Sequence, residues 1–99
     1  MDILSYRHKG LKALAASARA RNVKGIPAAF ADKLHRQLTF IQAASNIQQL
    51  ATVPSWRLHL LEPKHQQRWS MWVSGNYRLT FRLNPASNEV LDVDLEDYH

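Results

Sequence analysis

Two stretches of alternating apolar and polar residues flank a short turn in the second half of the sequence. The alternation covers residues 69–73 and 77–83, and Ser74, Gly75 and Asn76 lie between them. Alternation with a period of two indicates strands that bury one face, and a short turn with a glycine able to take a positive φ indicates a tight hairpin. The chain must therefore contain an antiparallel pair of strands, which limits the folds available to it.

The hairpin also predicts which residues face one another. The expected pairs are Val73 with Tyr77, Trp72 with Arg78, Met71 with Leu79, and Trp69 with Phe81. Because successive side chains point to opposite faces of a sheet, the last two pairs are expected to share an apolar face that packs under helices. The opposite face then carries Ser70, Trp72, Arg78, Thr80 and Arg82. An open basic face with an aromatic side chain beside an arginine suits RNA binding.

The remaining segments predict helices that cover one side of a sheet. We expect strands at residues 3–6, 57–60 and 90–95, and helices at residues 8–20 and 27–44, where apolar residues recur at helical spacing. The resulting order is β-α-α-β-β-β-β, an α+β fold with two N-terminal helices packed on one face of a mainly antiparallel sheet. With 99 residues and no repeat or linker, the chain is expected to form one domain over residues 1–99.

Basic and acidic residues are distributed unevenly along the chain. The chain has 13 Lys and Arg against 8 Asp and Glu, and a net charge of +5. Five of the acids lie in the last eleven residues, so residues 1–88 hold every Lys and Arg against three acids. Such an excess predicts attraction to a polyanion, with RNA or DNA as the first candidate, and a basic protein without such a partner is the alternative.

Several classes of protein are excluded by residues that the sequence lacks. There is no cysteine, no apolar run of about 20 residues, and no GxxxxGK[ST], GxGxxG, HExxH or GxSxG motif. A zinc site formed by His59, His65, His99 and nearby acids is an alternative without a recognised ligand spacing. We therefore expect a cytoplasmic protein without a membrane span, metal or cofactor.

Proton-exchanging groups occur at one strand and at the last residues of the sequence. Asp97, Tyr98 and His99 follow the alternating residues 90–95, so a strand is expected to deliver them to a defined place. Arg78 offers a permanent bidentate cation for a phosphate, or else stacks on Trp72. His59 is expected on the polar face, where it serves proton transfer or is simply solvated.

Residues 8–12, 57–59, 69–73, 75–81 and 96–99 together resemble the HigB branch of the RelE superfamily, in the same order and nearly end to end. The resemblance implies a bacterial toxin of a type II toxin–antitoxin pair with a microbial-ribonuclease-type fold. It implies a ribosome-dependent endoribonuclease that cuts translated mRNA in the A site of the 70S ribosome. It also implies a HigA-type helix-turn-helix antitoxin, with operator DNA contacted only through that antitoxin.

Site residues follow from matching these motifs to this sequence. The expected catalytic residues are His59, Arg78, Asp97, Tyr98 and His99, and the expected RNA-binding residues are Lys9, Lys12, Lys64, Arg68, Trp72 and Arg82. The chain departs from the family at Ser74, where some relatives have a basic residue, and Lys64 or Arg68 is the candidate replacement. The alternative is a non-catalytic or degenerate member that binds RNA, the ribosome or an antitoxin without cleavage.

Overall fold

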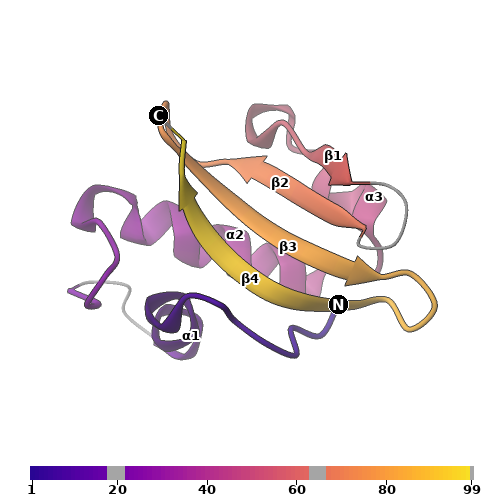
Figure 1. The fold of residues 1–99 in the computed structure, drawn as a ribbon, viewed down its shortest axis with the longest axis horizontal. Helices are drawn as coiled ribbons and strands as arrows, with labels where there is room; N and C mark the ends of the chain where they lie inside the picture. Colours follow the sequence, from indigo (N-terminus) through magenta and orange to yellow (C-terminus); the bar gives the residue numbers. More distant parts are fainter. Residues whose placement is uncertain (18–21, 63–66, 99) are drawn as a thin grey trace.

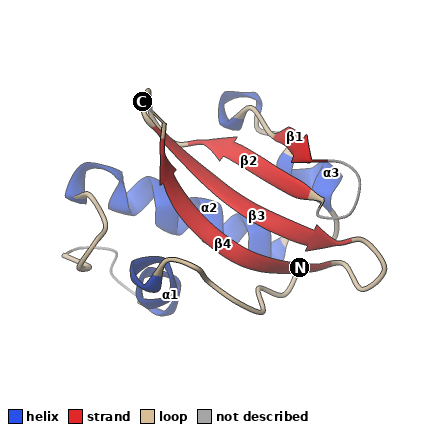
Figure 2. Ribbon diagram, viewed as in Figure 1, coloured by secondary structure: helices blue, strands red, loops and turns tan. Residues whose placement is uncertain are grey.

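The fold is a four-stranded sheet whose described helices all lie on one face (Figure 1, Figure 2). The computed structural model describes residues 1–17, 22–62 and 67–98. The helices are α1 (Lys9–Ala16), α2 (Ala31–Ala43) and α3 (Ile47–Leu50), with 3₁₀ turns at Ala28–Phe30 and Pro54–Trp56. The strands are β1 (His59–Glu62), β2 (Arg68–Trp72), β3 (Tyr77–Asn84) and β4 (Glu89–Asp97). The predicted α+β class is confirmed.

The strands lie side by side in the order β1-β2-β3-β4, which is also their order along the chain, and each adjacent pair is antiparallel. The predicted register of the hairpin is confirmed, because Trp72 pairs with Arg78 and the other expected partners follow. Gly75 does not take the positive φ that we expected. The turn is instead supported by Ser74, whose Oγ accepts a hydrogen bond from the Tyr77 amide at 3.3 Å.

The predicted first strand is reduced to two isolated bridges beside β4. Ile3 pairs with Val90 and Tyr6 with Val93, both in parallel. Between these two bridges, Asp92 takes a left-handed conformation with φ of 53°. A residue in this conformation interrupts the regular ladder, so the N-terminal segment contacts β4 without forming a continuous strand.

The helices differ from the expectation at their ends. The first was expected to reach residue 20, but α1 ends at Ala16, and residues 18–21 lie outside the described part of the chain. The second was expected to begin at Pro27, but a 3₁₀ turn precedes α2. The extra helix α3 lies in a segment expected to be a connector, where the Asn46 side chain accepts a hydrogen bond from the Gln49 amide at 3.2 Å. None of the described helices is long and apolar enough to cross a membrane.

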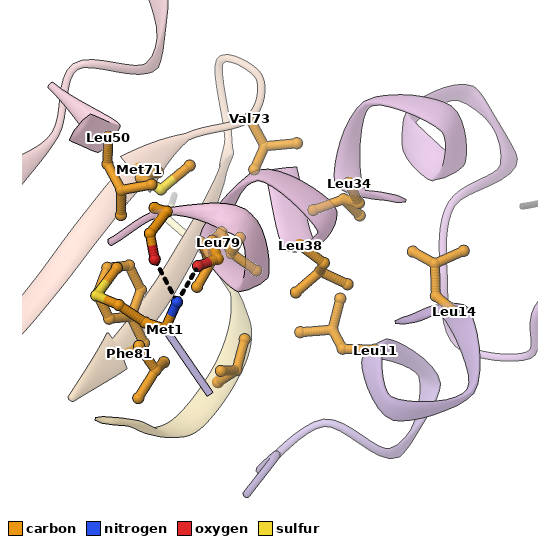
Figure 3. Packing of buried hydrophobic residues seen from close by; sticks show 14 of the residues in the cluster. Met1, Leu11, Leu14, Leu34, Leu38, Leu50, Met71, Val73, Leu79 and Phe81 are labelled. Atoms are coloured by element: carbon orange, nitrogen blue, oxygen red, sulfur yellow. Dashed lines mark hydrogen bonds between the residues drawn. The ribbon is translucent and has the colours of Figure 1, made fainter. Parts of the chain in front are cut away.

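The core lies between the helices and the apolar face of the hairpin (Figure 3). Its fully buried members include Leu11 and Leu14 of α1, Leu34, Leu38 and Ile41 of α2, and Met71, Leu79 and Phe81 of the sheet. Trp69 was expected in this core but is only partly buried at its margin. The Met1 amino group donates hydrogen bonds to the carbonyl groups of Ile41, at 3.1 Å, and Ala44 where α2 ends. Because the core and the described helices occupy one face of the sheet, the opposite face is available to carry a site.

We predict that Gly10→Ala destabilises the protein. A Cβ at residue 10 would lie 2.7 Å from the carbonyl oxygen of Lys24 and 2.8 Å from the His8 ring. Such overpacking typically costs about 1–3 kcal/mol, which outweighs the gain of about 1 kcal/mol in helix propensity. Urea unfolding should therefore show a lower free energy of unfolding.

Gly75→Ala is the matched control for this substitution. A Cβ at residue 75 meets no atom within 4 Å. We expect this variant to unfold within about 0.5 kcal/mol of the wild type. If the alanine at residue 10 is as stable as the wild type or more so, helix propensity dominates and the packing argument is wrong.

Candidate active site on the open sheet face

A cleft of about 300 Å³ lies on the open face of the sheet, and its lining includes three residues that we predicted to be catalytic. The lining includes Arg57, His59, Ser70, Trp72, Arg78 and Tyr98. The register explains this convergence, because His59 pairs with Ser70 on β2, and Ser70 pairs with Thr80 on β3. Side chains two residues apart along a strand share a face, so Arg78 and Trp72 project to the same side as His59.

Arg78 is held in place by its own hairpin. Its Nη1 donates hydrogen bonds to the carbonyl oxygens of Ser74, at 2.8 Å, and Tyr77, at 3.0 Å. The guanidinium carbon lies 5.7 Å from the centre of the Tyr98 ring, so the arginine stacks on that ring. Within the described part of the chain, Nε and Nη2 form no hydrogen bond. One edge of the guanidinium is thus anchored, and the other can meet a ligand.

The cations that contact the Trp72 ring are Lys33 and Arg57, whereas the hairpin register had suggested Arg78. The Lys33 Nζ lies 4.4 Å from the ring centre and the Arg57 guanidinium carbon 5.6 Å from it. Both contacts are within the range of a cation–π interaction. Burial lowers the pKa of Lys33 from its usual value, and the nearby charge of Arg36 lowers it further.

Lys33 and Arg57 were not predicted to take part in this cleft. Lys33 belongs to α2, and its Nζ donates a hydrogen bond at 2.8 Å to the carbonyl oxygen of Val73, at the end of β2. Arg57 takes a left-handed conformation with φ of 47° just before β1. Neither the turn of the chain at Arg57 nor the approach of α2 to β2 has a signal in the local sequence.

The end of β4 brings Asp97 and Tyr98 next to the hairpin. Asp97 pairs with Tyr77, and the Tyr98 amide donates a hydrogen bond at 2.6 Å to the carbonyl oxygen of Asn76. The Tyr98 side chain is 40% exposed and lines the cleft. The prediction that a strand delivers these groups to one place therefore agrees with the backbone. His99, also predicted to be catalytic, lies outside the described residues.

Two predicted RNA-binding arginines form ion pairs with acids of β4. Arg82 Nη1 lies 2.9 Å from the Asp92 carboxylate, and Arg68 pairs with Glu96. Arg68, Thr80, Arg82, Asp92 and Asp94 line a second hollow of about 280 Å³ on the open face, which we call the middle hollow. The acids that lie apart from the basic residues in the sequence thus fold back against them. Charge separation along the chain does not persist in three dimensions.

The other predicted residues lie away from the cleft or outside the part of the chain that the structure describes. Lys9 and Lys12 belong to α1, and neither lines the cleft. Lys64 and His65 fall within residues 63–66, outside the described part. Among the described residues, no group of three or more His, Cys, Asp or Glu is placed to hold a metal ion.

Comparison with known proteins identifies the family of this chain. A family model described as the RelE-like toxin of the type II toxin–antitoxin system HigB matches residues 4–99. A Proteus vulgaris protein named Endoribonuclease HigB is 32% identical over 97 residues, covering 98% of this chain and 99% of the relative. An uncharacterized Haemophilus influenzae protein is 38% identical over 69 residues, which are 68% of each chain. This chain therefore belongs to the HigB-like family of RelE-like toxins from type II toxin–antitoxin systems.

Proposed function

We propose that this chain is a ribosome-dependent endoribonuclease that cleaves translated mRNA in the ribosomal A site and thereby inhibits growth. The observation that carries the proposal is the convergence of His59, Arg78 and Tyr98 in one cleft on the open face. A relative that aligns over nearly the whole chain is named an endoribonuclease, which supports the same activity here. Residues 1–99 would act as one domain in the cytoplasm.

The proposed chemistry uses the nucleophile that RNA itself carries. The 2′-oxygen attacks the adjacent phosphorus while the bond to the 5′-oxygen breaks, giving a 2′,3′-cyclic phosphate. One group must take the 2′ proton and another must give a proton to the 5′-oxygen. His59, Asp97 and His99 are the proposed proton-exchanging groups, with no metal ion required. Arg78 would stabilise the charge that develops on the phosphorane.

The electrostatics and rings of the cleft suit a single RNA strand. None of the described lining residues is acidic, whereas Arg57 and Arg78 contribute fixed positive charge. Lys33 adds a cation against the Trp72 ring. The exposed Tyr98 ring can stack on a base, and the partly buried Trp72 ring lines the same cleft, as aromatic side chains do in proteins that bind unpaired RNA.

Membership of the family implies an antitoxin partner for this chain. We propose that this partner is a HigA-type helix-turn-helix protein, and that the toxin reaches operator DNA only through it. The 70S ribosome would be the second partner, and the predicted RNA-binding residues Lys9 and Lys12 on α1 would contribute contacts to RNA. Such phosphate contacts position a protein without reading sequence.

The activity can be tested by inducing the protein in cells and mapping mRNA ends by primer extension. We expect new 5′ ends within translated codons for the wild type and far fewer for His99→Ala. Purified protein should cut ribosome-bound mRNA much faster than the same RNA without ribosomes. Equal rates on both substrates would exclude ribosome dependence, and no cleavage of either would favour the non-catalytic alternative.

Arg78→Ala should remove most of the cleavage while the fold is retained, and Arg78→Lys should restore only part. Lysine keeps the charge but loses the two-pronged geometry and the anchoring to Ser74 and Tyr77 carbonyl groups. Losing one such electrostatic contact costs about 10²–10³ in rate. The measurement is single-turnover cleavage on ribosome-bound mRNA, with thermal unfolding as the control for folding. Wild-type rates for the alanine variant would show that Arg78 is misassigned.

Tyr98 offers a test that separates stacking from hydroxyl chemistry. Its ring lines the cleft and stacks with Arg78, so Tyr98→Ala should weaken RNA binding by about 1–3 kcal/mol. Tyr98→Phe keeps the ring and should retain most of the cleavage rate. The two variants should be compared by single-turnover kinetics at several enzyme concentrations. A phenylalanine variant as inactive as the alanine variant would mean that the hydroxyl acts directly.

A further inference from the structure

A third hollow, outside the cleft, has basic residues but no described acid in its lining. It has a volume of about 630 Å³ and lies between α1 and residues 23–25. We call it the α1 hollow, and its lining includes Arg7, Lys9 and Lys24 but no described Asp or Glu. All three side chains belong to exposed residues. Three cations around a concave surface favour an anionic ligand. Arg7 also lines the middle hollow with Asp92 and Asp94, whereas Lys9 and Lys24 share no lining of these three hollows with a described acid.

Close packing holds the walls of this hollow together. Gly10 approaches the Lys24 carbonyl oxygen so closely that a Cβ would lie 2.7 Å away. His8 accepts a hydrogen bond on Nδ1 from the Gly10 amide at 3.1 Å, and its ring also faces Gly25. The loop that carries Lys24 is therefore docked onto the start of α1. The cations are presented from two packed segments rather than from one loose end.

Arg7 connects the α1 hollow to the open face of the sheet. It lines both the α1 hollow and the middle hollow. Its amide donates a hydrogen bond at 2.8 Å to the carbonyl oxygen of Val93, which fixes it at the outer edge of β4. The cleft and the middle hollow in turn adjoin along β3, where Arg78 and Arg82 are about 13 Å apart. Ser70 of the cleft also pairs with Thr80 of the middle hollow, so the middle hollow lies between the cleft and the α1 hollow.

Among the three hollows, only the middle one has described acids in its lining. In the middle hollow, Arg82 is paired with Asp92 and Arg68 with Glu96. The cleft at one end and the α1 hollow at the other contain no described acid in their linings. A polyanion crossing the sheet would therefore be held most firmly at the ends, with the middle contributing little net attraction.

We propose that the α1 hollow binds phosphates of the same RNA strand that occupies the cleft, and that Arg7 contacts this strand where it passes the edge of β4. Arg7 and Lys24 become RNA-binding residues beside Lys9. That this strand is the substrate rests on the proposed nuclease function. That the hollow binds RNA does not depend on it. Such contacts act on the phosphates and carry no base preference.

The test measures binding of a strand that cannot be cleaved. A fluorescent 2′-O-methyl RNA of about 12 nucleotides is titrated with protein at several salt concentrations, and binding is followed by anisotropy. The variants are Arg7→Gln, Lys24→Gln and their combination. Arg36→Gln is the matched control, because Arg36 is an exposed cation of α2 that lines none of these three hollows. Arg7→Lys keeps the charge, and thermal unfolding checks the fold of every variant.

Each lost phosphate contact should lower the slope of log K against log salt by about 0.7, so the double variant should lose about 1.4. Arg7→Lys and Arg36→Gln should keep the wild-type slope. The proposal is overturned if the double variant binds the strand with the slope of Arg36→Gln. It is equally overturned if the double variant loses affinity only for ribosomes without mRNA, since ribosomal RNA would then be the ligand. Failure of the nuclease proposal would appear separately, as wild-type protein that binds the strand normally but cuts no mRNA.

Discussion

The pairing of β2 with β3 in a single register is the constraint on which the rest of the molecule depends. Met71 opposite Leu79 and Trp69 opposite Phe81 turn apolar side chains toward the helices. The same register turns Arg78 to the open face. A slip by one residue would exchange the two faces and expose the core, so burial of the core specifies the position of the arginine. Core formation and site formation are one event in this hairpin.

Electrostatics then decide which parts of the open face remain positive. The ion pairs of Arg68 with Glu96 and Arg82 with Asp92 are partly exposed, and such pairs contribute only about 0–1 kcal/mol to stability. The two ion pairs matter more for the electrostatic potential of the open face, because each of them neutralises one cation in the middle of that face. The positive charge that would attract a polyanion over distance therefore comes from the cleft and from the α1 hollow.

Alternation predicted the hairpin, its register and the buried face because each depends on neighbours within one short segment. The first predicted strand failed because the left-handed Asp92 breaks the ladder on β4, far away in sequence. The sequence pointed to His59, Arg78 and Tyr98 for the cleft, but not to Lys33 and Arg57, which join it through tertiary contacts. The loss of charge separation was likewise not predictable from the sequence, since it arises only when β4 folds beside β3.

The shortness of β1 explains how α2 takes part in a site on the opposite face of the sheet. The β1 ladder reaches only as far as Ser70, so it does not extend to the end of β2. There, Gln37 donates a hydrogen bond at 3.1 Å to the carbonyl oxygen of Trp72, and Lys33 donates one to Val73. Unpaired edge groups are costly when buried, so these side chains of α2 complete the edge. Because Leu34 and Leu38 anchor the same helix in the core, the docking of α2 positions the Trp72 ring and its cation together.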